Sequence, residues 1–164
     1  MCDRLHKDYH ASDLLRDIFS TGDSSRLYNQ LVKEQKLFST VSAYVTESID
    51  DGLFLVEGRL QEGVSMEQGN AAIVSVLQQM IEEKISEEEL TKVKNKIESY
   101  MLFGEVNILN RAMNLAYFDM LGNAADLNDE LAKYKAVTAD DIQRVANQIF
   151  QSKQCNTIHY YSKK

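Results

Sequence analysis

The hydrophobic pattern changes its period over residues 38–60, and this change restricts the folds that the chain can adopt. Apolar and polar residues alternate from Phe38 to Ser48, which is typical of a strand with one covered face. Asp50-Asp51-Gly52 is a turn signal, and Leu53–Leu60 fits the returning strand of an antiparallel hairpin. On both sides of this hairpin the apolar residues recur at helical spacing. The chain is therefore expected to fold as an α+β protein.

About six helices are expected to pack against the sheet. The chain has no proline, against about 5% in average usage, which fits uninterrupted helices with short turns. Ser86 with Glu89, and Thr138 with Asp141, have the capping-box spacing of helix starts. Asp23 or Ser24 is expected to cap the second helix. The helices are predicted at about residues 11–19, 24–36, 66–81, 87–121 with a bend near 104, 126–134 and 139–150.

A third strand is predicted at Cys155–Tyr161, which gives an antiparallel sheet of about three strands. The 164 residues suffice for one hydrophobic core, and residues 1–164 are expected to form a single domain. Three strands make a thin sheet for the apolar surface of six helices. We therefore expect that the first strand of the domain, or a whole partner domain, precedes Met1 in the natural protein.

The composition excludes several classes of function. A net charge of −7 without a basic stripe argues against nucleic-acid binding. No apolar run approaches the roughly 20 residues of a membrane span. Cys2 and Cys155 lie at opposite ends and form no disulfide framework. Two cysteines are compatible with a reducing compartment or with two buried thiols.

The three histidines do not form the motif of a zinc peptidase. Such a site needs two histidines with a glutamate between them on one helix face. His6 and His10 are the only close pair, and no glutamate lies between them. They could share a helix face and bind a metal, but two solvated imidazoles at a polar helix start are the simpler interpretation. For His159, a packing role across neighbouring strands is expected.

No catalytic residue is predicted from the remaining polar clusters. The paired carboxylates at 50–51, 82–83, 87–89 and 140–141 fall at turns or in first helical turns, where negative charge complements the helix dipole. Thr21–Tyr28 has the general shape of an anion site but lacks the spacing of a phosphate-binding loop, so a helix start is the better interpretation.

Four short patterns occur in a fixed order along the chain. They are Gly22-Asp-Ser-Ser-Arg-Leu-Tyr28, Leu31-Val-Lys-Glu-Gln-Lys-Leu-Phe-Ser-Thr-Val-Ser-Ala43, Ser86-Glu-Glu-Glu-Leu90 and Val137-Thr-Ala-Asp-Asp-Ile142. In that order and at those separations the chain resembles the pitrilysin/insulinase-type (M16) zinc peptidases and their mitochondrial-processing-peptidase-like relatives. From about Tyr9 to Tyr161 it is similar to the C-terminal, non-zinc half-domain of a bacterial member. The resemblance leaves the compartment open between the cytoplasm and the periplasm of a bacterium.

This resemblance implies an M16/LuxS-like metallohydrolase half-domain. In the family, two homologous halves enclose a chamber, and the first half carries HxxEH, which binds zinc. The second half closes the chamber over an unfolded peptide. The present chain lacks HxxEH, so it is expected to be the second half, without a cofactor of its own and inactive alone, with zinc in the partner half.

The second half of active members commonly supplies an arginine and a tyrosine, seven residues apart, that hold the peptide. Those positions align with Val32 and Ser39, so no substrate-binding residue is carried over to this chain. Arg26, Tyr28 or Lys33 could compensate, although all three also fit a helix packed beside the hairpin.

Three functions therefore remain open. The leading prediction is a zinc-free half of an M16-type metalloendopeptidase that encloses and positions peptide. The alternative is a non-catalytic assembly or scaffolding subunit of a processing-peptidase-like complex. A helical binding module with an acidic surface is the third.

Overall fold

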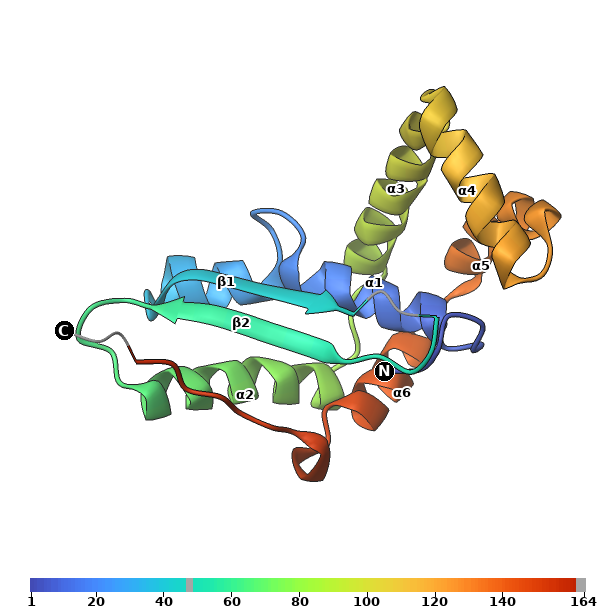
Figure 1. Ribbon diagram of the computed structural model, residues 1–164. Coiled ribbons are helices and arrows are strands. Elements are labelled where there is room, and N and C mark those ends of the chain that lie inside the picture. Colours follow the sequence, from blue (N-terminus) through green and yellow to red (C-terminus); the bar gives the residue numbers. More distant parts are fainter. Residues whose placement is uncertain (47–48, 162–164) are drawn as a thin grey trace.

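The expected hairpin forms from β1 (Phe38–Val45) and β2 (Phe54–Leu60), which pair antiparallel. The computed structural model describes residues 1–46 and 49–161. Within these residues the sheet has two strands (Figure 1). The segment Cys155–Tyr161, predicted as a third strand, pairs with neither of them and is exposed along its length. A segment with strand composition becomes a strand only when a neighbouring strand takes its backbone hydrogen bonds.

The fold class is confirmed, because helices precede and follow the hairpin along the chain in the predicted order. The single helix expected at residues 87–121 is two helices that meet at an angle near Gly104, and both stand away from the sheet (Figure 1). The helical elements are α1 (Tyr9–Ser20), η1 (Tyr28–Glu34), α2 (Met66–Glu82), α3 (Glu87–Gly104), α4 (Ile108–Leu121), η2 (Ala124–Asp129), α5 (Glu130–Ala136), α6 (Ala139–Ile149) and η3 (Ser152–Gln154).

The predicted capping boxes have different outcomes. At α6 the box is complete: the Thr138 hydroxyl accepts from the Asp141 amide, and the Asp141 carboxylate accepts from the Thr138 amide. At α3 the Ser86 hydroxyl accepts from the Glu89 amide at 3.1 Å. The carboxylate of Glu89 does not return to Ser86; it accepts two hydrogen bonds from Arg26 instead. A charged donor outcompetes a backbone amide for a carboxylate because charge-assisted hydrogen bonds are stronger.

The second predicted helix also differs from the expectation. Its central part, η1, is a π-helix, and neither Asp23 nor Ser24 caps it. The Asp23 carbonyl and the Ser24 hydroxyl accept instead from Lys33 and Lys92, respectively.

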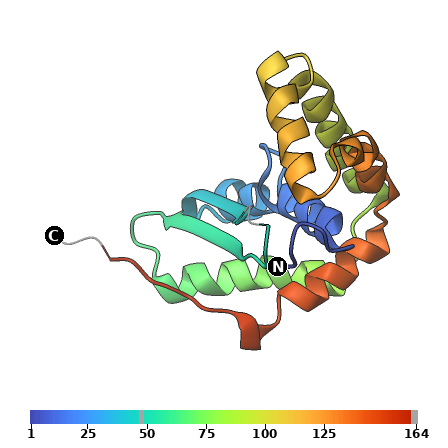
Figure 2. The same ribbon diagram turned by 45° about the vertical axis from the view of Figure 1, so that its right-hand side comes forward.

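One face of the hairpin carries the core. This covered face packs against α1, α2 and α6 (Figure 2). A hydrogen bond from the Gln143 side chain to the Ile81 carbonyl ties α6 to α2. Phe19 of α1 is fully buried between Phe54 and Phe150, with ring centroids 6.1 and 5.4 Å away in edge-to-face contacts. The opposite face of the hairpin, here called the open face, consists of Thr40, Ser42, Tyr44, Leu55, Glu57 and Arg59.

Gly58→Ala is expected to destabilise the fold by about 1–3 kcal/mol through overpacking. A Cβ at Gly58 would lie 2.5 Å from Cε1 of Phe38, whose ring is buried and has little room to move. Gly104→Ala is the matched control, because a Cβ there meets nothing within 4 Å. Urea denaturation should show a loss of stability for the first variant and none for the second. Equal effects of the two substitutions would contradict this packing.

Candidate functional site

Three backbone irregularities follow one another between residues 28 and 40. The π-helix η1 comes first, and Lys36 then has a positive φ of 53°. The pairing of β1 with β2 shifts its register between Phe38 and Thr40, so Ser39 is the extra residue of a bulge. π-Helical turns and bulges are enriched at functional sites. This irregular segment contains both positions that the sequence singled out, Val32 and Ser39.

The two singled-out positions do not supply a grip for a ligand. Val32 is half-buried and packs against the core, so its side chain contributes to folding. Ser39 is exposed, and its hydroxyl donates to the Arg59 carbonyl at 3.0 Å. At the position of the family's arginine the structure therefore has the apolar Val32. At the position of the family's tyrosine it has Ser39, whose hydroxyl is already hydrogen-bonded within the domain.

The three residues considered as substitutes already have contacts within the domain. Arg26 binds both carboxylate oxygens of Glu89, at 3.1 and 2.8 Å. Lys33 donates to the Asp23 carbonyl at 2.9 Å, and its ammonium lies 5.0 Å from the centre of the Tyr28 ring. Arg26 therefore ties the segment before η1 to α3, and Lys33 ties η1 to the preceding turn.

The open face of the hairpin lies next to this segment and offers mixed polar and apolar contacts. Its residues form three cross-strand pairs: Thr40 with Arg59, Ser42 with Glu57 and Tyr44 with Leu55. Five of the six are exposed, and Leu55 is partly exposed. Hydroxyl, carboxylate, guanidinium and aromatic groups can bind an extended peptide by hydrogen bonds and stacking. None of them is arranged with a base as an activated nucleophile, so the open face is suited to binding.

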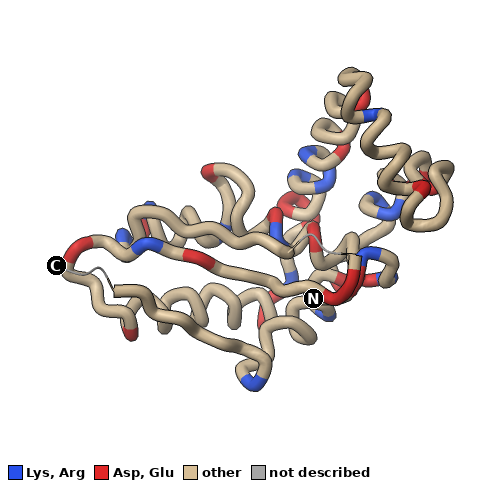
Figure 3. Tube along the Cα trace, in the orientation of Figure 1, with Lys and Arg blue, Asp and Glu red and all other residues tan. Residues whose placement is uncertain are grey.

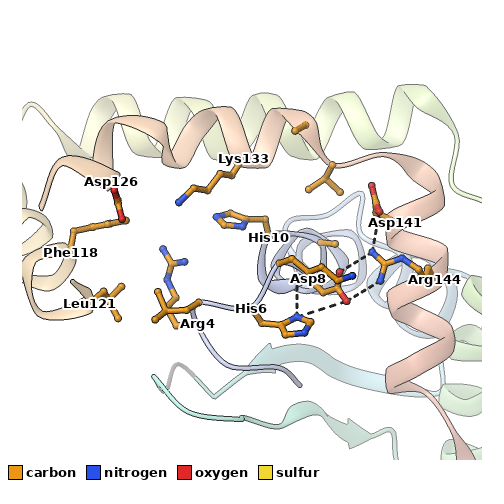
Figure 4. A pocket seen from close by; sticks show the side chains of 15 residues that line it. Arg4, His6, Asp8, His10, Phe118, Leu121, Asp126, Lys133, Asp141 and Arg144 are labelled. Carbon is orange, nitrogen blue, oxygen red and sulfur yellow. Dashed lines mark hydrogen bonds and ion pairs between the residues drawn. The ribbon is translucent and has the colours of Figure 1, made fainter. Parts of the chain in front are cut away.

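A second candidate is a pocket between the N-terminal segment and the helices α5 and α6. Its volume is about 650 Å³, and Figure 4 shows charged groups from several elements around it. Arg144 of α6 donates to both carboxylate oxygens of Asp8, at 2.9 and 2.8 Å, and to Asp141 at 3.0 Å. Deeper in the same region Arg4 donates to Glu130, which also forms a hydrogen bond of 3.0 Å with His10.

The electrostatics of the pocket favour fixed ion pairs. Burial alone raises the pKa of Glu130, but the hydrogen bond from His10 and the charge of Arg4 outweigh burial and hold that pKa below its ordinary value. The hydrogen bonds from Arg144 lower the pKa of Asp8. Hydrogen bonds from Thr138 are the main reason that the pKa of Asp141 falls to about 2. These groups stay charged near neutral pH, so the network fastens the N-terminal segment to α5 and α6.

The histidines are placed differently from the expectation. His6 is exposed, as predicted for a solvated imidazole, but His10 is buried and bonded to Glu130. The prediction was wrong for His10 because its partner lies 120 residues away in the sequence. His159 is exposed and belongs to no strand, so its predicted packing role across strands is wrong as well. Among residues 1–46 and 49–161, no three or more His, Cys, Asp or Glu side chains are grouped so that they could hold a metal ion.

Acid is expected to destabilise the domain through these carboxylates. A carboxylate with a lowered folded-state pKa contributes stability above its unfolded pKa and loses it as the pH falls through the folded pKa. The free energy of unfolding should therefore fall between about pH 4.5, the ordinary value for glutamate, and about pH 2. Glu130→Gln should make this fall shallower in urea titrations at a series of pH values. A fall with an unchanged slope in the variant would exclude Glu130 as a cause.

Comparison with known sequences identifies a family. Residues 1–97, more than half of the chain, match the family described as the peptidase M16 inactive domain. This part includes the hairpin and the irregular segment. No curated protein matches the chain. In the described part of the chain no helix has the length and apolar character needed to cross a membrane.

Comparison with solved structures shows the same fold. A protease from Helicobacter pylori is 23% identical with a TM-score of 0.85, over 94% of this chain and 37% of that protein. A candidate zinc protease from Bordetella pertussis Tohama I is 22% identical with a TM-score of 0.84, over 97% of this chain and 87% of that protein. The inactive peptidase domain of a candidate zinc protease from Bordetella parapertussis is 20% identical with a TM-score of 0.86, over 100% of this chain and 89% of that protein. The chain belongs to the peptidase M16 family, as its inactive domain.

Proposed function

We propose that the chain is the zinc-free half of an M16-type metalloendopeptidase. Residues 1–164 act as one domain in this proposal. The domain encloses and positions an unfolded peptide opposite a separate half that carries HxxEH. The match of residues 1–97 to the inactive domain of the family carries this proposal. The donor groups of the chain support it, because they do not fit a zinc site: HxxEH is absent from the sequence, and the described residues form no metal-binding group. The zinc is accordingly assigned to the partner half.

The open face of the hairpin is the surface that we assign to the peptide. Tyr44 is 43% exposed and pairs with Leu55, which together give an apolar contact for a side chain of the peptide. Glu57 and Arg59 on the same face offer charged partners at two neighbouring positions. A half of this kind contributes orientation, because it holds the peptide while bond cleavage takes place on the other half.

Binding of a fluorescently labelled unfolded peptide tests this assignment. Tyr44→Asp should weaken binding about tenfold or more, because it removes the one aromatic side chain among the six residues of the open face. Tyr100→Asp is the matched control, because Tyr100 is exposed on α3 outside the open face. Fluorescence anisotropy with the purified variants measures both dissociation constants. Equal losses in the two variants, or no binding by the unaltered chain, would refute the assigned surface.

The second candidate function is an assembly or scaffolding subunit of a processing-peptidase-like complex. The residues at the family's arginine and tyrosine positions favour it, since Val32 is packed into the core and the Ser39 hydroxyl is already bonded. A scaffolding subunit needs no affinity for peptide. It would bind a zinc-bearing half with the same affinity before and after Tyr44→Asp, and it would show no anisotropy change with the peptide.

A further inference from the structure

The edge of β2 that faces away from β1, here called the outer edge, has free backbone groups. The Leu53 carbonyl accepts from the Thr46 amide at 3.0 Å, on the side of β1. Successive residues of a strand point their backbone groups to opposite edges, so Phe54, Val56 and Gly58 direct their N–H and C=O groups to the outer edge. None of these groups has a hydrogen-bond partner among the described residues. A free edge of this kind is a template for a further strand.

The N-terminal residues already lie in line with this edge. The Met1 amino group donates to the Gly52 carbonyl at 2.8 Å, and the Gly52 amide donates to the Met1 carbonyl at 3.0 Å. Three residues further along the chain, the Arg4 amide donates to the carbonyl of Ile49, which lies three residues before Gly52. The two contacts therefore belong to one antiparallel register. Gly52 points its backbone groups to the same side as Phe54, so an extension of this register beyond Met1 follows the outer edge of β2.

The segment Cys155–Tyr161 lies on the side of the same edge. It runs in the direction of β2, on the side away from β1 (Figures 1 and 2). Residues 156–161 take part in no backbone hydrogen bond within the described part of the chain. Charged side chains, which commonly protect a free strand, are absent from residues 155–161 (Figure 3). A strand placed between β2 and this segment would run antiparallel to both and give each of them backbone partners.

We propose that the occupant of the outer edge is an extended strand joined to the amino end of Met1. In the register of Met1 with Gly52, the second, fourth and sixth residues before Met1 lie opposite Phe54, Val56 and Gly58. Their side chains fall on the covered face of the sheet, and those of the residues between them fall on the open face. The strand should therefore alternate apolar and polar residues in this phase. A separate peptide fits the edge less well, because its end would meet the charged amino group of Met1.

Amide hydrogen exchange of a chain that carries an added strand tests the proposal. The chain is extended by a short segment with valine at the second, fourth and sixth positions before Met1 and threonine at the first, third, fifth and seventh. Exchange at Phe54, Val56 and Gly58, followed by NMR, should slow about tenfold or more relative to the unextended chain, because each of these amides gains an acceptor. Unchanged exchange at all three amides would overturn the proposal.

A matched control tests the register and the source of the strand. An extension of the same composition, with valine at the first, third and fifth positions before Met1, places threonine on the covered face and should leave exchange fast. Equal slowing by both extensions would refute the register. The first extension supplied as a separate peptide should give no slowing at micromolar concentration, because it lacks the high effective concentration of a joined segment. Slowing by the separate peptide to the same degree would assign the edge to a partner and overturn the joined strand. Anisotropy with the unextended chain tests the open face separately.

Discussion

Glu130→Ala should cost about 3–5 kcal/mol of unfolding free energy, because it leaves Arg4 as a buried charge without its partner. Glu130 is 4% exposed and Arg4 8% exposed, so water compensates only poorly for the lost carboxylate. His10 loses its hydrogen bond in the same variant. Lys133, whose ammonium lies 3.7 Å from Oε2 of Glu130, loses a neighbouring charge as well. Urea denaturation at neutral pH measures the effect.

A matched control separates burial from charge pairing. Glu98 is also paired with a lysine, Lys135 at 2.7 Å, but this pair is partly exposed at the surface. Glu98→Ala should therefore cost only about 0–1 kcal/mol. The double variant Arg4→Leu with Glu130→Leu should lose less unfolding free energy than the sum of the losses caused by Arg4→Leu alone and Glu130→Leu alone. The reason is that it removes both buried charges together. Additive losses would mean that the two residues act independently.

Phe19→Ala should cost about 3–5 kcal/mol, because it opens a cavity where α1, β2 and the end of α6 meet. Phe19 is fully buried, and its ring contacts Phe54 and Phe150, which also contact each other at 5.1 Å. Removing the central ring deprives both neighbours of their edge-to-face contacts. Phe103→Ala makes the same chemical change at a site that is 78% exposed and should be close to neutral. Thermal and urea unfolding of both variants give the comparison, and similar losses would contradict this description of the core.

The elements that could be predicted from the sequence are those fixed by neighbouring residues. The hairpin follows from the alternation over residues 38–45 and the turn at 50–52. The capping box of Thr138 and Asp141 is also local, because both hydrogen bonds join residues three apart. Four patterns in order sufficed to predict the family, which the match over residues 1–97 confirms.

The features that were missed depend on distant partners. The pair of Arg4 and Glu130 joins residues 126 positions apart, and Asp8 and Arg144 are 136 positions apart. No local pattern marks such pairs. Glu89 fits a capping box from its own neighbours, yet Arg26, 63 residues earlier, takes its carboxylate. The bulge at Ser39 likewise depends on how β1 pairs with β2, and the residue pattern of β1 alone does not determine that register.

The proposed role of the chain is consistent with how its polar groups are used. Buried charges such as Arg4 and Glu130 are paired with one another, and they hold the domain together. The exposed polar groups of the open face lie on the hairpin, where they can contact a peptide. This division of roles is what we expect of a domain that confines a substrate while a partner performs the hydrolysis.

The most direct test of the central proposal is peptide turnover by the purified chain, measured with an unfolded peptide in the presence of added zinc and again with a chelator. The account predicts no turnover under either condition and no zinc bound in proportion to the protein. Turnover that requires zinc and disappears with the chelator, in a preparation that contains only this chain, would contradict the account.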